Sequence, residues 1–268
     1  WLNQGDGTFR DGSSIIETLP PQWTVSAAIA DLNNDGLAEI VDANYVEGDD
    51  VATRRCLLKG IPRACSPLNF RPSKGRLLSV DEAGLFREIP EPFSSGSIHS
   101  GNALGLVIFR LKDQSLPSIF VANDQVANLM LIAKPDSSSP LGVRYEDHAL
   151  LSGLAYDGEG KAQACMGVAA GDTNRDGAID LLVTNYFDET NTLYLQEPNG
   201  IFRDATRSSG LIAPSLKMLG FGAQFLDAQN DGEADLVVLN GHIDDMTHAG
   251  MGYRMRSQFF LGNGQSKW

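Results

Sequence analysis

The chain has 268 residues, 42% of them hydrophobic, which is enough to bury the core of one large β domain or two small ones. Its 34 acidic residues outnumber its 21 basic residues, and the formal net charge is −13. That charge repels nucleic acids and anionic membranes, and no apolar run approaches the roughly 18 residues of a membrane span. No basic and then apolar leader precedes Trp1, so the chain reads as a mature fragment or as one whose leader is missing.

The N-terminal residues 1–11 read as a strand end, a glycine turn and the start of a second strand, and similar turns return at 195–204 and 259–264. A second repeated pattern precedes this turn. It consists of an apolar strand, a loop, another apolar strand and an asparagine. The asparagines are Asn44, Asn123, Asn185 and Asn240. We therefore read four units, whose first strands lie near 25–30, 104–110, 166–170 and 220–225.

The first loop of this kind, residues 31–39, is acidic and lies between two apolar runs. Oxygen-bearing side chains stand at loop positions 1, 3, 5 and 9, and glycine at position 6 permits a tight turn. Position 7 offers its backbone carbonyl. Ca²⁺ takes about six to eight oxygen ligands and tolerates irregular geometry. The loop therefore predicts a calcium site formed by Asp31, Asn33, Asp35, Leu37 and Glu39.

The chain continues with an insertion at 46–75, which contains two of the three cysteines. Cys56 and Cys65 are 65 − 56 = 9 positions apart in a loop-like segment. We predict a disulfide between them, worth roughly 3 kcal/mol in the chain-entropy model, with two unrelated free thiols as the alternative. The third cysteine, Cys165, reads as a small buried residue beside a predicted strand.

The second unit departs from the pattern, because its loop at 111–118 keeps Asp113 and lacks the other ligands, so we expect no calcium there. The acidic pattern returns at 172–180 and at 227–235. Gln229 stands where Asp or Asn is usual, which should weaken the last site. The predicted ligands are Asp172, Asn174, Asp176, Ala178 and Asp180 in one loop, and Asp227, Gln229, Asp231, Glu233 and Asp235 in the other.

A single cluster of this composition could be a solvated hairpin turn, because Asp, Asn and Gly favour turns without any metal. Three copies argue instead for a repeat with about three calcium sites. An EF-hand needs a glutamate at position 12 and flanking helices, whereas these loops carry Asp42, Val183 or Val238 there and are followed by β-branched residues typical of strands.

Four short strands per unit at a period of roughly 55–60 residues predict an all-β fold, a β-propeller of four-stranded antiparallel blades. We expect one domain or domain fragment over 1–268, with blades at roughly 21–90, 97–150, 164–206 and 218–265. Small residues in the first strands, such as Gly167 and Gly220, would lie near the crowded central axis, where backbones approach closely.

These features resemble the FG-GAP/VCBS repeat propellers, which include integrin α-subunit heads, and within them the ASPIC/UnbV and cartilage-acidic-protein-like branch. The cysteine insertion is similar to one in bacterial members of that branch. The resemblance implies a secreted or cell-surface protein that binds Ca²⁺ in its loops, usually in a ring of seven blades. The four units are then a smaller closed ring or a part of a longer one. The resemblance is carried by residues 167–185, 191–195, 202–206, 210–211, 220–223 and 239–244.

We expect a non-catalytic, calcium-stabilised module that presents a rigid surface to a protein or carbohydrate partner. It would be secreted, periplasmic or at the cell surface, and the absence of an Asn-x-Ser/Thr sequence favours a bacterial source. One alternative is a polysaccharide lyase or hydrolase, for which His242, Asp244 and Asp245 are weak candidates. Another is a structural scaffold in a larger extracellular assembly, with 46–75 or the Ser- and Pro-rich segment 133–164 as its docking surface.

Overall fold

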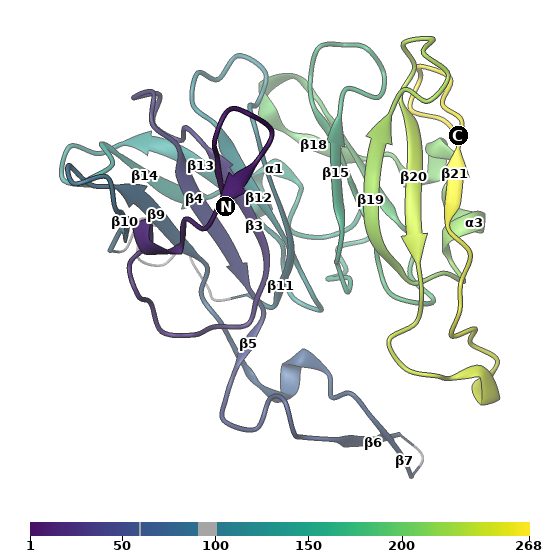
Figure 1. Cartoon of the computed structure of the whole chain (residues 1–268). Helices are drawn as coiled ribbons and strands as arrows, with labels where there is room; N and C mark the ends of the chain where they lie inside the picture. The colour runs from purple at the N-terminus through teal and green to yellow at the C-terminus, as the bar shows by residue number, and fades with distance from the viewer. Residues whose placement is uncertain (59, 91–100) are drawn as a thin grey trace.

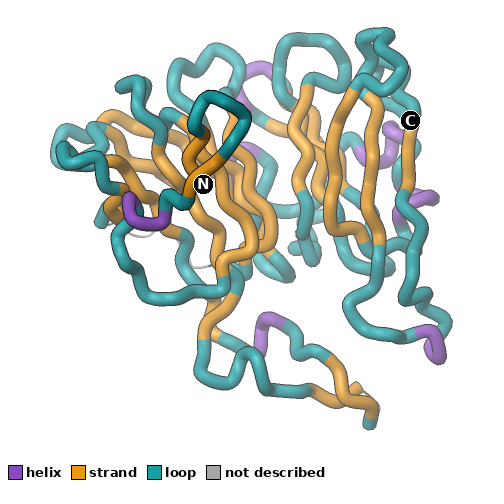
Figure 2. Tube along the Cα trace, viewed as in Figure 1, coloured by secondary structure: helices purple, strands orange, loops and turns teal. Residues whose placement is uncertain are grey.

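The computed structural model describes residues 1–58, 60–90 and 101–268. Four antiparallel sheets stand side by side as the blades of a β-propeller, and the few helices are short (Figures 1 and 2). The all-β propeller predicted from the repeats is therefore confirmed. Residues 97–100, with which the predicted second blade begins, lie outside the described residues, as does residue 59 of the insertion.

Three of the sheets are four-stranded meanders. The first contains β3 (Thr24–Ala30), β4 (Glu39–Asn44), β9 (Arg76–Val80) and β10 (Phe86–Glu88). The second contains β11 (Ala103–Phe109), β12 (Ser118–Asn123), β13 (Leu129–Pro135) and β14 (Val143–Asp147). The third contains β15 (Val168–Gly171), β16 (Asp180–Val183), β17 (Thr192–Gln196) and β18 (Phe202–Asp204). The first strands β3, β11, β15 and β19 are neighbours in this order, so they are the inner strands of the blades.

The fourth sheet contains β19 (Gly220–Leu226), β20 (Asp235–Asn240) and β21 (Gln258–Phe260), so the described residues give it three strands instead of the predicted four. After β21 the chain covers the sheet with a side chain, because the Trp268 ring stacks on Phe225 at 5.8 Å between centroids. The indole N–H of Trp268 also donates to the Ala234 carbonyl at 2.9 Å. These contacts fasten the C-terminal residue to the inner strand β19 and to the loop before β20.

The remaining elements are small. A separate hairpin pairs β1 (Leu2–Asn3) with β2 (Phe9–Arg10), and the helices α1 (Ala149–Ser152), α2 (Thr206–Ser209) and α3 (Ile212–Ser215) follow the outer strands. None of the helices among the described residues has the length and apolar character that a bilayer crossing requires. The segment 133–164, named above as a docking surface in the scaffold alternative, contains the end of β13, all of β14 and α1, so its first half belongs to a blade.

Each hydrophobic core lies between two neighbouring blades. Side chains alternate between the faces of a strand, and β12 shows the result: Ile119 and Val121 pack toward the first blade, while Phe120 and Ala122 pack toward the third. The third core joins β15 and β16 to the fourth sheet through residues such as Leu182 and Phe225. The blades therefore stabilise one another, as expected for a repeat whose single unit cannot bury its own faces.

Glycines let the inner strands approach one another. A Cβ added at Gly167 would lie 1.7 Å from the Phe221 carbonyl oxygen of the next blade, and one at Gly105 would lie 2.2 Å from the Met166 carbonyl oxygen. Real Cβ atoms do not approach other atoms so closely, so these positions accept only glycine in this packing. The small residues predicted near the axis thus have a steric cause.

The repeated asparagine fastens the end of the second strand in every blade. Its side-chain Nδ2 donates to a backbone carbonyl of the connection that follows, at 2.7–2.9 Å: Asn44 to Lys74, Asn123 to Ala127, Asn185 to Thr190 and Asn240 to Arg256. The residue after each asparagine is consequently held at the end of the blade opposite the acidic loops. That end carries the insertion, in which β5 (Val46–Glu47) pairs with β8 (Arg71–Pro72) and β6 (Cys56–Leu58) with β7 (Ile61–Arg63).

Candidate functional site

The three acidic loops lie at one end of the blades and share one backbone conformation. They connect the inner strands β3, β15 and β19 to the strands that follow. Loop positions 4 and 6 are left-handed in every case, with φ between 56° and 90°. Glycine at position 6 adopts this conformation without a steric cost. The residues concerned are Asn34 and Gly36, Arg175 and Gly177, and Asn230 and Gly232.

The aspartate at position 1 organises each turn by accepting two backbone N–H groups. In the loop 172–180, Asp172 Oδ1 accepts from the amide of Asp176 at 3.1 Å and its Oδ2 accepts from that of Gly177 at 2.8 Å. Asp31 and Asp227 make the same two bonds in their loops, at 2.7–3.2 Å. The carboxylates are therefore held in place by the loop backbone.

The acid at position 9 is fully buried in all three loops, as Glu39, Asp180 and Asp235. Asp180 accepts from the Thr173 amide at 3.0 Å and from the Gln196 amide on β17 at 3.0 Å. Burial raises the pKa of Asp180, and the charge of Asp176 raises it further. Burial likewise raises the pKa of Glu39, to which the loop aspartates add. Ionised carboxylates in these positions are costly until a positive charge compensates them.

The donor set fits a hard cation. Each predicted ligand offers oxygen, from a carboxylate, an amide or the position-7 carbonyl, and a carboxylate oxygen that accepts one N–H keeps a second lone pair. The side chains nevertheless point toward backbone amides, and within the described ranges no three His, Cys, Asp or Glu side chains are gathered about one point. The loops thus hold the right ligand types in three copies of one arrangement.

Neighbouring loops contact one another across the blades. The side-chain Nδ2 of Asn34 donates to the Ser115 carbonyl at 3.0 Å, and Lys112 Nζ donates to the Asp176 carbonyl at 2.5 Å. Arg175 pairs with Glu233 at 2.9 Å in the following loop. The second unit, whose loop keeps only Asp113, therefore places a lysine amine against the acidic loop 172–180 of the third blade.

The candidate residues at 242–245 lie at the opposite end of the blades. His242 is buried, its Nε2 lies 3.3 Å from the Tyr186 hydroxyl, and its Nδ1 accepts from the Asp244 amide at 3.1 Å. Asp244 pairs with Arg63 of the insertion at 3.8 Å, while Asp245 accepts from the Thr247 amide at 3.1 Å. These residues lie near one another, and each of the three contacts other groups of the protein.

Residues 1–41 and 172–238 match the family model of the FG-GAP-like repeat. The two matched ranges contain all three acidic loops and leave out the loop at 111–118 of the second unit. The chain is similar to FG-GAP-repeat propellers. The repeat match and the four-blade arrangement together support an FG-GAP type of β-propeller. Among curated proteins, none matches the chain.

The disulfide predicted in the insertion of this FG-GAP-like propeller is confirmed, since Cys56 and Cys65 are bonded, and Cys165 is buried as expected. Sequence reasoning missed Tyr45 and Asp124, the residues that follow the repeated asparagine in the first two blades. The Tyr45 hydroxyl donates to Asp124 Oδ2 at 2.6 Å across the blade interface. Their shared position after Asn44 and Asn123 is the signal that could have paired them.

We expect Tyr45→Phe to destabilise the protein increasingly as the pH rises. Burial raises the pKa of Asp124, and the Tyr45 hydroxyl partly offsets this. A raised folded-state pKa means that the stability contributed by protonated Asp124 is present at low pH and is lost as pH rises through that pKa. Without the hydroxyl this loss grows. When the pH is raised from roughly 4 to roughly 8, the variant should therefore lose about 1–3 kcal/mol more stability than wild type. Urea unfolding at both pH values with calcium present measures the difference.

The matched control is Tyr253→Phe, because Tyr253 is 46% exposed. It should change stability by less than about 0.5 kcal/mol at either pH. A Tyr45→Phe effect of the same size at both pH values would show that Asp124 ionisation is not involved.

Proposed function

We propose that the chain is a calcium-binding extracellular β-propeller that serves as a non-catalytic interaction module for a protein or carbohydrate partner. The observation that carries the proposal is the repetition of one loop structure three times, with an oxygen ligand available at positions 1, 3, 5, 7 and 9 in each copy. A solvated turn does not require a buried acid at its ninth position, whereas a loop that binds a cation can use that acid as a ligand.

In this proposal the cation would be held by the oxygens of each loop and would supply positive charge against the buried acid. Asp31, Asp172 and Asp227 are already positioned by backbone amides, so little ordering would remain for metal binding. Because the position-9 acid also binds the amide or hydroxyl of a residue beyond its own hairpin, such as Ser79 or Gln196, metal binding would be coupled to the stability of the blade.

The local contacts of residues 242–245 support a structural role for them. Both ring nitrogens of His242 have partners, and its ring packs edge-on against Tyr186 with centroids 5.5 Å apart. A general base needs a lone pair directed at a substrate. The disulfide supports an oxidising compartment, which is the extracellular space, the periplasm or the cell surface. The disulfide-bonded insertion supports a place for the chain in the ASPIC/UnbV-like branch.

Calcium stoichiometry tests the proposal. After treatment with a chelator and its removal, isothermal titration with CaCl₂ should show about three bound ions per chain, because calcium sites of this ligand type bind in the nanomolar to millimolar range. Asp176→Asn should remove one of them, whereas Asp113→Asn in the second unit should remove none. Absence of calcium binding at millimolar CaCl₂ in folded protein would overturn the proposal.

A further inference from the structure

A pocket of about 860 Å³ lies between the insertion and the blade ends, on the side opposite the acidic loops. Its size is within the range of small-ligand pockets, roughly 300–1,000 Å³. All four blades contribute to its lining, and the insertion supplies a further wall. It is separate from the calcium loops, which lie at the other end of β4, β16 and β20.

The repeat builds the blade side of this pocket. Three inner strands change register near their first residues, between Thr24 and Ser26, Ala103 and Gly105, and Gly220 and Gly222. Such a bulge redirects the side chain of the extra residue. The residues at this position, together with their counterpart in the third blade, all line the pocket: Val25, Leu104, Phe221 and Met166.

The positions after the repeated asparagines form a second set of lining residues. They are Tyr45, Asp124 and Tyr186, one from each of the first three blades. Trp23 meets Tyr45 edge-on at 6.0 Å between ring centroids. Trp23 is 48% exposed and Phe221 is 44% exposed. The pocket therefore presents accessible aromatic rings beside a hydrogen-bonded Tyr45 and Asp124 pair.

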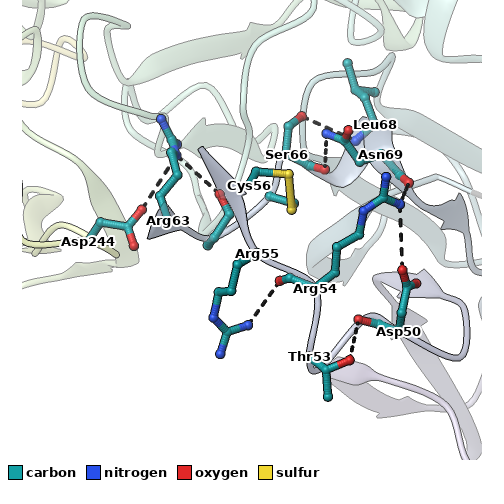
Figure 3. Close-up of a disulfide and its surroundings, with 12 residues drawn as sticks. Asp50, Thr53, Arg54, Arg55, Cys56, Arg63, Ser66, Leu68, Asn69 and Asp244 are labelled. Carbon is teal, nitrogen blue, oxygen red and sulfur yellow. Dashed lines mark hydrogen bonds and ion pairs between the residues drawn. A yellow bond between two sulfur atoms is a disulfide. The ribbon is translucent and has the colours of Figure 1, made fainter. Parts of the chain in front are cut away.

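The insertion closes the pocket by reaching from the first blade to the others. Arg63 pairs with Asp244 of the fourth blade at 3.8 Å, beside the disulfide, as Figure 3 shows. Ser66 donates to the Gln125 side chain of the second blade at 3.1 Å. The bond between Cys56 and Cys65 holds both of these contact residues on one short segment. The disulfide thus stabilises the segment that forms one wall of the pocket.

Charges in the lining balance one another. The lining contains three arginines, Arg54, Arg55 and Arg63, and three acids, Asp124, Glu189 and Asp244, so its formal charges cancel. Glu189 binds Lys161 Nζ at 2.9 Å and the Ala164 amide at 2.8 Å, and Arg54 lies over the Phe70 ring at 5.6 Å. Because the lining carries no net formal charge, it offers no excess attraction to an ionic ligand, and this balance favours a neutral one.

We propose that this pocket binds a neutral carbohydrate. The C–H faces of a sugar ring would pack on Trp23 and Phe221, and its hydroxyls would exchange hydrogen bonds with Asp124 and Gln125. The lining thus combines the two kinds of contact that a neutral sugar makes, an accessible aromatic ring face and hydrogen-bonding side chains beside it. The inference rests on the proposed function as an interaction module and names the class of its ligand.

The test uses four neutral β-1,4-linked hexasaccharides, of glucose, mannose, xylose and N-acetylglucosamine, titrated calorimetrically into calcium-saturated protein. At least one should bind. Trp23→Ala and Phe221→Ala should each weaken that binding about tenfold or more, since each removes a stacking face. Phe259→Ala is the matched control, because Phe259 is an exposed aromatic residue of a strand of the same blade as Phe221 and lies outside the pocket. Its affinity should equal that of wild type.

A double Cys56→Ser, Cys65→Ser variant should also bind the sugar more weakly while its blades keep their circular dichroism. The assignment is overturned if none of the four sugars binds, if both aromatic variants bind as wild type does, or if only an apolar peptide competes for the pocket. If calcium stoichiometry is unchanged in the same samples, such a result counts against the pocket alone and leaves the proposed calcium module standing.

Discussion

Removal of calcium is expected to lower the melting temperature by tens of degrees. A site occupied at about one hundred times its Kd contributes about 2.7 kcal/mol, so three sites contribute about 8 kcal/mol. In a domain of this size each kcal/mol corresponds to roughly 2–4 °C, which gives a shift of about 16–32 °C. The physical cause is the set of buried acids Glu39, Asp180 and Asp235, which lose their compensating charge. Differential scanning calorimetry with excess chelator or with millimolar CaCl₂ measures the shift.

Two single substitutions make this experiment specific to the loops. Asp176→Asn keeps the side-chain oxygen that accepts the Ala178 amide at 2.8 Å but removes the charge, so it should reduce the calcium-dependent shift by about a third. Asp113→Asn changes an acid in the loop that lacks the pattern and should leave the shift intact. An identical melting curve with and without chelator, in protein shown to bind calcium beforehand, would contradict a structural role for the ion.

Most of the fold could be predicted from the sequence because its determinants are local. Strand, loop, strand and asparagine recur at fixed order, and each element requires only nearby residues, as Gly177 and Asp172 do in one turn. The disulfide was predictable for the same reason, since its cysteines are nine positions apart. Repetition then provided the evidence that a single local pattern could not.

The missed features depend on contacts between blades. The pocket requires β-bulges that aim residues such as Leu104 inward, and it requires an insertion that returns to a blade about 180 residues later in the sequence, as Arg63 does toward Asp244. The interpretation of 133–164 as a docking segment overlooked β14, because the residues just before the strand, 136–142, are rich in Ser and Pro. Amino-acid composition identifies turns well, but it identifies a short strand beside a turn poorly.

Gly167 lies where two blades approach most closely, so an added methyl group there is expected to have a large effect on stability. Gly167→Ala would place a Cβ 1.7 Å from the Phe221 carbonyl oxygen, so β15 and β19 would have to separate, and the core that contains Leu182 and Phe225 would loosen with them. We expect a loss of about 3 kcal/mol or more in the free energy of unfolding, measured by guanidinium titration with calcium present.

Gly241→Ala provides the control for this prediction, because a Cβ there would meet no atom within 4 Å. It should change the free energy of unfolding by less than about 0.5 kcal/mol. Both variants replace a glycine with an alanine, so their unfolded states lose the same conformational freedom. Only the contact between blades differs. Equal midpoints for the two variants would mean that the inner strands are not packed backbone against backbone, and the propeller arrangement of these blades would then be wrong.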